Sequence, residues 1–204
     1  MDVIRGMGPQ ALPHLQEHLH NPTWYIVRNA LNLVADLGHV GLLREVTGHL
    51  RHRDPRVRHA AVRATHRLGG AAAESPLLEV LPTTDPETQE EILLVLGKIR
   101  SVRATQVLTP MAASHENPER LRIKAIETLG LCGQASTIPT LVELIRRKGR
   151  IFTSAEPLPV RVAAVQALKA LGLPEAEQAM VQVVREEGRS EERRALLAAA
   201  GLQA

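Results

Sequence analysis

The pentapeptide HLQEH at residues 14–18 has the residue types and the spacing of a zinc site. Histidines four positions apart lie on one face of a helix, where both rings can bind one metal ion, and the glutamate beside them can activate a bound water for hydrolysis. Such a site also needs a third ligand and a substrate cleft. No later segment repeats the motif, so we predict a solvated helix face opposite Leu12, Leu15 and Leu19, without a metal ion.

Other catalytic chemistry has little support in the composition of the 204 residues. One Trp, one Tyr and one Phe are too few to line a stacking groove for single-stranded nucleic acid or an aromatic cofactor pocket. The single cysteine, Cys132, occupies an apolar position of a helix, which is typical of an inert core thiol. The pair Gly69-Gly70 closes a helix and forms no phosphate loop. We therefore predict no catalytic residues, no cofactor and no enzymatic activity.

The segment from Arg51 to Arg67 is strongly basic, with six Arg and three His against one acid. On a helix, His59, Arg63 and His66 share a face with Arg67 away from the apolar side, a pattern able to bind phosphates or an acidic partner. The middle third of the chain has an acidic excess, which interrupts a long track for nucleic acid. We therefore rank nucleic acid below protein as the partner, with a solvated arginine-rich surface as the alternative to any binding role.

Five segments of the chain repeat one apolar pattern. Each has mostly apolar residues at offsets 0, 4, 8 and 11, which lie on one face of a helix. The segments begin at Ile26, Val57, Thr88, Leu121 and Val160. A second stretch of helical periodicity follows each segment. The repeat unit is therefore two helices, which can bury their apolar faces only by stacking on neighbouring pairs.

Turn residues at both ends of the segments support these boundaries. Asp or Asn before proline is typical of a helix N-cap followed by a proline in the first turn. The residues that precede the segments are Asn21-Pro22, Asp54-Pro55, Asp85-Pro86, Asn117-Pro118 and Glu156-Pro157. Four of the segments are predicted to end on a left-handed glycine, and the third has Arg100 instead. Those glycines are Gly38, Gly69, Gly133 and Gly172.

The stretch DPRVRHAAVRATHRLG from Asp54 resembles the short bacterial HEAT repeat, and TWYIVRNALNLVADLG resembles a recurrent form of it. The resemblance implies an all-α fold, a right-handed α-α superhelix of about five to six helix pairs. It also implies a structural role for Arg58, Arg122 and Arg161, because this family uses an arginine at that position to bond carbonyls or acids of neighbouring turns.

We predict a single solenoid domain over residues 1–204. Its predicted parts are a half repeat at 1–21, repeats at 22–54, 55–85, 86–117, 118–156 and 157–188, and a terminal half repeat at 189–204. Because both ends cut through a repeat, we expect a piece of a longer array or ends that pack on something, with crude capping by the half repeats as the alternative. The long connector at 146–157 holds Phe152 and is expected to be a tolerated loop.

These observations predict an interaction scaffold whose inner surface, formed by second helices, binds a protein that the sequence does not identify. Candidate contact residues are Arg44, His49, Arg51, His52, Arg146 and Arg147. Trp24 and Tyr25 are expected to cover the end of the preceding helix pair rather than to form a binding hot spot. Similar repeats occur in phycobilin lyases, so a lyase-like maturation factor is one alternative and a nucleic-acid-binding solenoid is another. The lone cysteine and the absence of a membrane-spanning apolar run favour a cytoplasmic protein.

Overall fold

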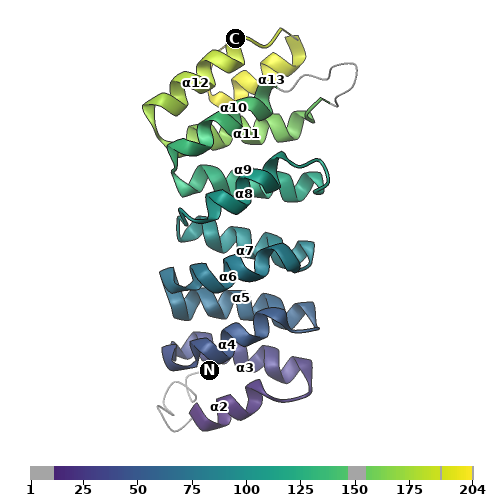
Figure 1. Ribbon diagram of the computed structural model, residues 1–204, viewed down its shortest axis with the longest axis vertical. Coiled ribbons are helices and arrows are strands. Elements are labelled where there is room, and N and C mark those ends of the chain that lie inside the picture. Colours follow the sequence, from purple (N-terminus) through teal and green to yellow (C-terminus); the bar gives the residue numbers. More distant parts are fainter. Residues whose placement is uncertain (1–11, 147–154, 189, 204) are drawn as a thin grey trace. The chain divides into compact units, whose positions relative to one another are not determined.

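The structure of the chain, a computed structural model, describes residues 12–146, 155–188 and 190–203. Every regular element within these ranges is helical, and they contain no strand. The chain divides into two compact units, Met1–Val95 and Leu96–Ala204. Each unit consists of stacked helix pairs (Figure 1). The predicted repeat boundaries stay a prediction.

The first unit contains two complete helix pairs and the helix that precedes them. Its helices are α2 (Leu12–Leu19), α3 (Trp24–Leu37), α4 (Leu43–Gly48), α5 (Pro55–Gly69) and α6 (Glu74–Val80). The first helices of the two pairs, α3 and α5, pack side by side (Figure 1). The second helices α4 and α6 are short, and 3-10 turns extend each of them at both ends.

The second unit continues the same arrangement. Helix α7 (Pro86–Lys98) begins in the first unit and ends in the second. The others are α8 (Ala104–Ala113), α9 (Glu119–Cys132), α10 (Ile138–Arg146), α11 (Leu158–Leu171), α12 (Pro174–Arg185) and α13 (Ser190–Ala200). Helix α11 packs against α9, α10, α12 and α13.

The apolar positions of the repeat form the core, as predicted. At offsets 0, 4, 8 and 11 of the five segments, all side chains are buried except Ile26, Leu37 and Ile99, which are half-buried. Cys132, at the last of these positions in its segment, is 3% exposed, which confirms its assignment to the core.

The predicted N-caps are correct for the two aspartates and wrong for the two asparagines. Asp54 accepts a hydrogen bond from the Arg56 amide at 2.9 Å, and Asp85 accepts one from the Thr88 amide at 3.1 Å. The Asn21 side chain instead accepts from the amide of Thr23, the residue immediately before α3, and the Asn117 side-chain amide donates to a carbonyl of α8. An asparagine side chain can donate as well as accept, so other backbone groups compete with the helix end for it.

The residues with positive φ that end the first helices agree with the prediction except at the end of α5. Gly38, Gly133 and Gly172 have positive φ angles as predicted. Gly69, however, lies inside α5 with φ of −91°, and Gly70 has a positive φ of 50° with ψ of −118°, which differs from the αL conformation of the other three glycines. In the third segment Arg100 has φ of 51° and is the one non-glycine residue in this region among those described. The repeat therefore requires the left-handed turn even where no glycine is available.

The predicted structural arginines link successive turns. In the first unit, Arg58 donates to the carbonyls of His52 and Arg53, at 2.7 Å and 3.0 Å, and to the Asp85 carboxylate at 2.6 Å and 2.9 Å. One guanidinium thus joins the end of one pair to the start of α7. This agrees with the structural role that the resemblance implied.

The same contacts recur in the second unit. Arg122 donates to the Ala112 carbonyl at 2.9 Å and to Glu156 at 2.7 Å. Arg161 donates to the Ile145 carbonyl at 2.8 Å and pairs with two glutamates. Both arginine side chains are almost fully buried.

We expect Asp85→Asn to lower the free energy of unfolding by about 1 kcal/mol at pH 7, because Asn keeps the helix cap but loses the charge that faces Arg58. Burial raises the pKa of Asp85, but hydrogen bonds from Thr88 and Arg58 outweigh burial and hold the pKa well below its ordinary value. A lowered folded-state pKa contributes stability above the unfolded value of about 4, and this contribution fades as the pH falls through the folded value.

Urea unfolding of both proteins at pH 7, 4 and 3 measures this effect. The stability gap between wild type and variant narrows toward pH 3 if the ion pair is its source. A gap that is constant over this range would contradict the assignment.

Candidate protein-binding surface

The HLQEH motif lies on a solvated face of α2, as the sequence predicted. His14, Glu17 and His18 are exposed, whereas Leu15 and Leu19 are 4% and 1% exposed and face the core. Among the described residues, one group of three potential metal ligands has its ligand atoms close together, and it contains no residue of the HLQEH motif.

The basic face predicted on α5 is largely paired with acids of the neighbouring helices. Arg63 lies 3.5 Å from Glu91 of α7, and Arg67 forms an ion pair with Asp36 of α3. These acids are distant in sequence but face α5 across the stack. They reduce the charge that this face can offer to phosphate groups.

The six predicted contact residues fall at different places. Arg44 is exposed on α4, while His49, Arg51 and His52 follow in the turn after it, with the rings of His49 and His52 6.1 Å apart. Arg146, in the second unit, forms an ion pair with Glu186 at 3.1 Å. Arg147 lies outside the described residues. The structure therefore brings three of the six predicted residues together.

A pocket of about 350 Å³ opens beside this turn. It lies between the 3-10 turn after α4, the 3-10 turn after α6 and the start of α7. Its lining residues are Leu50, Arg51, His52, Arg53, Arg58, Val80, Thr83, Thr84 and Asp85. We call it the arginine pocket. Two of the predicted contact residues, Arg51 and His52, line it.

Two of the three arginines in the pocket, Arg51 and Arg53, are available to bind a ligand. Arg58 is held by Asp85 and by two carbonyls. Arg51 pairs with Glu79 at 2.8 Å, but both side chains are more than half exposed, so water competes with the pair and its net stabilisation is small. Arg53 is exposed. The pocket thus combines two exposed guanidinium groups with Arg58, which its hydrogen bonds hold in place.

The histidine next to the pocket adds little positive charge at neutral pH. Burial lowers the pKa of His49, and the nearby His52 and His20 lower it further. Charge recognition in this region therefore depends on the arginines.

A stacked tryptophan extends the surface beyond the pocket. The Arg56 guanidinium lies 3.3 Å from the centre of the Trp24 ring, and that of Arg28 lies 5.2 Å from it. The Asp54 carboxylate binds Arg56 at 2.7 Å and 3.0 Å, which fixes the guanidinium over the ring and holds the pKa of Asp54 at about 2. Tyr25 meets Trp24 edge-on and is 50% exposed. This stack was not predicted from the sequence, because Trp24 and Arg56 lie at the start of successive first helices and meet only when the pairs stack.

Helix pairs that stack through apolar faces, with an arginine bonding the next turn, define an α-solenoid repeat protein. The chain belongs to the HEAT-repeat family: the family model for HEAT repeats matches residues 43–121, 75–156 and 112–201. The predicted family and the predicted all-α solenoid class are thereby confirmed.

Solved structures of repeat proteins share the fold at low sequence identity. An engineered protein is 16% identical with a TM-score of 0.60, and the match covers 98% of this chain and 96% of that one. The complex of CpcE and CpcF of phycocyanin lyase from Nostoc sp. PCC7120 is 18% identical with a TM-score of 0.51, covering 97% and 84%. A designed armadillo repeat protein is 17% identical with a TM-score of 0.51, covering 93% and 98%.

A search of curated proteins finds no match to the chain. Within the described part of the chain, no helix combines the length and the apolar character that crossing a bilayer requires.

Proposed function

We propose that the chain is a non-enzymatic protein-binding module and that its arginine pocket binds an acidic segment of a partner protein. The observation that carries this proposal is the pocket itself, about 350 Å³ in volume and lined by Arg51, His52, Arg53 and Arg58. Arginines in a concave site bind carboxylates through paired hydrogen bonds and impose geometry as well as charge. The Thr83 and Thr84 hydroxyls also line the pocket but donate to the Val80 carbonyl and to Asp85, so the arginines supply the donors for a ligand carboxylate.

The exposed aromatic and cationic groups near the pocket support a protein partner. Tyr, Trp and Arg are enriched at protein interfaces, and the Trp24–Arg56 stack combines an aromatic ring with a guanidinium in a fixed geometry.

The size of the pocket also favours protein over nucleic acid. A single pocket can hold one or two acidic side chains with their flanking backbone. Nucleic acid requires a longer series of phosphate contacts, and the acids that pair with Arg63 and Arg67 interrupt such a series on α5.

The likeness to the CpcE–CpcF complex, at 18% identity, shows the fold alone. No arrangement of the described side chains favours a lyase-like maturation factor over a binding module. The proposed compartment is the cytoplasm, on the same grounds of cysteine usage as before.

Charge reversal in the pocket tests the proposal. We expect the double variant Arg51→Glu and Arg53→Glu to weaken binding of the partner tenfold or more, because carboxylates would then face carboxylates. The matched control is Arg193→Glu with Arg194→Glu, which makes the same charge change at two exposed positions of α13. Affinity purification from nuclease-treated native lysate, with quantification of proteins lost in the pocket variant but kept in the control, measures the effect.

Two results would contradict the proposal. One is a set of bound proteins that both double variants retain equally. The other is recovery of RNA or DNA instead of protein when the purification is repeated from lysate without nuclease, with the nucleic acid released at high salt.

A further inference from the structure

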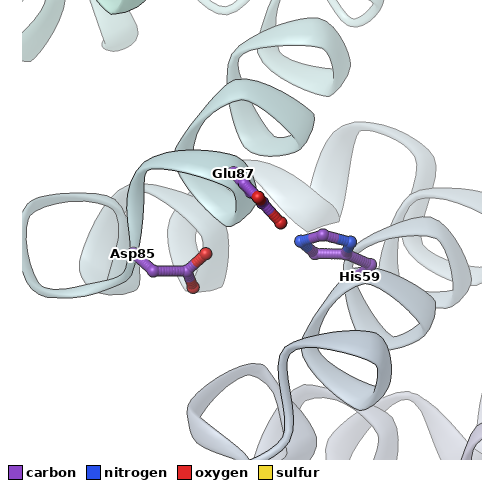
Figure 2. Close-up of side chains that lie close together, drawn as sticks. All are labelled: His59, Asp85 and Glu87. Atoms are coloured by element: carbon purple, nitrogen blue, oxygen red, sulfur yellow. The ribbon is translucent and has the colours of Figure 1, made fainter. Parts of the chain in front are cut away.

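We propose that His59, Asp85 and Glu87 form a binding site for a divalent transition-metal ion of the Zn²⁺ type. His59 comes from α5, Asp85 immediately precedes α7, and Glu87 lies in the first turn of α7. Each residue offers one ligand atom, and these atoms all lie within 4.8 Å of one another. Figure 2 shows the Asp85 and Glu87 carboxylates and the His59 ring converging on one space between the two helices. The site contains no residue of the HLQEH motif, and it shares Asp85 with the wall of the arginine pocket.

The observation that most favours a bound ion is an unpaired nitrogen atom of the His59 ring. Its Nε2 atom is buried and has no hydrogen-bond partner. In Figure 2 the ring nitrogen farther from the Cβ atom, Nε2, points toward the Glu87 carboxylate. A buried polar atom without a partner is destabilising, and an unseen ion or water commonly explains one. Nε2 forms no hydrogen bond with either carboxylate, but the ligand atoms of the three residues are close enough for one ion to bridge them.

The spacing suits a metal ion after a small movement. Ligand atoms bound to one zinc ion at about 2.0–2.2 Å are about 3–4 Å apart, somewhat closer than the limit of 4.8 Å seen here. Glu87 is exposed at the start of its helix, so its side chain can rotate toward an ion without moving the backbone. Small side-chain movements of the three ligands can close the remaining difference.

Asp85 is already fixed in position and retains the capacity to bind an ion. Its Oδ1 atom accepts a hydrogen bond from the Thr88 amide, and its Oδ2 atom accepts from Arg58 and the Thr84 hydroxyl. A carboxylate has about four lone-pair sites, so we expect Asp85 to bind a metal ion through Oδ1. The positive charge of Arg58 repels a cation, but the two negative charges of Asp85 and Glu87 outweigh this repulsion. We therefore expect moderate affinity that depends on all three ligands.

The donor set selects the kind of metal. One imidazole with two carboxylates suits Zn²⁺ and neighbouring first-row ions, whereas Mg²⁺ and Ca²⁺ prefer oxygen ligands alone. Three protein ligands also leave a coordination position for water or for a side chain of a bound protein. A metal here would tie His59 of α5 to Asp85 and Glu87 at the start of α7, which lie 26 and 28 positions later in the chain.

Calorimetric titration of the metal-free full chain with Zn²⁺ tests the inference in a background where His14→Ala and His18→Ala remove the other histidine pair. We expect one Zn²⁺ per chain and a rise in the melting temperature with Zn²⁺, because ligand binding to the folded state stabilises it. Titration with Mg²⁺ should show no comparable binding.

Two further substitutions identify the site in the same background. Glu87→Gln and His59→Gln should each weaken Zn²⁺ binding at least tenfold and abolish the melting-temperature rise. Glu87 is exposed, so its variant keeps the test valid even if the His59 variant is unstable. Zinc binding that disappears in the background itself, or that Glu87→Gln leaves unchanged, would overturn the inference.

Discussion

Replacing Arg161 with alanine is expected to lower the free energy of unfolding by about 3–5 kcal/mol. The Arg161 side chain is 4% exposed and pairs with Glu187, whose side chain is 1% exposed, and with Glu192. Its Nε atom also donates to the Ile145 carbonyl at 2.8 Å. Alanine would leave a carboxylate buried without its countercharge, and this penalty exceeds the energy of the lost contacts themselves.

Arg146→Ala is the matched control, because Arg146 makes a comparable pair with Glu186 in the same unit but both side chains are about half exposed. We expect a loss of about 0–1 kcal/mol there. Denaturant unfolding monitored by circular dichroism measures both losses. Adding Glu187→Gln to an Arg161→Met variant should recover part of the loss, since it removes the buried charge that faced Arg161. Equal effects of Arg161→Ala and Arg146→Ala would contradict this account.

The second large effect is expected at the closest approach of α9 and α11. A Cβ atom on Gly130 would lie 2.8 Å from the Ala167 Cα atom and 2.9 Å from its carbonyl oxygen. Both are backbone atoms, so the helices must move apart to accept even one methyl group. We expect Gly130→Ala to destabilise the protein by about 1–3 kcal/mol, although alanine favours a helix by about 1 kcal/mol over glycine.

Gly97 provides the control for this substitution. Its Cβ atom would lie 2.9 Å from the Leu131 Cδ1 atom, which ends a flexible side chain that is 49% exposed and can rotate away. Gly97→Ala should therefore be neutral or stabilising by up to about 1 kcal/mol. Thermal and urea unfolding of the two variants should give opposite signs relative to wild type. A loss of the same size in both would mean that helix contact at Gly130 is not the cause.

The core and the helix pairs could be predicted from the sequence because they repeat. An apolar position that recurs in five segments carries the same information five times, so single departures such as Thr65 and Thr88 do not hide the pattern. Both threonines are fully buried in the structure. The positions of Arg58, Arg122 and Arg161 were predictable for the same reason.

The surface sites could not be predicted in this way because they occur once. Thr83 and Thr84 join the arginine pocket only when α6 stacks beside the preceding pair, and Arg53 has no property in the sequence that distinguishes it from other arginines. His59 and Glu87 lie far apart in the chain. Aligned by repeat, however, His59 is two positions after the first apolar position of its segment and Glu87 one before that of the next. Comparison of adjacent repeats in register could have found this pair.

The most direct test of the proposed function is NMR titration of the ¹⁵N-labelled chain with a short glutamate-rich peptide at low salt. We predict chemical-shift changes concentrated at residues 50–58 and 83–85 around the arginine pocket, lost in the Arg51→Glu and Arg53→Glu variant and retained in the α13 control. Shift changes that leave the pocket residues unaffected, or that persist unchanged in the pocket variant, would contradict the central claim.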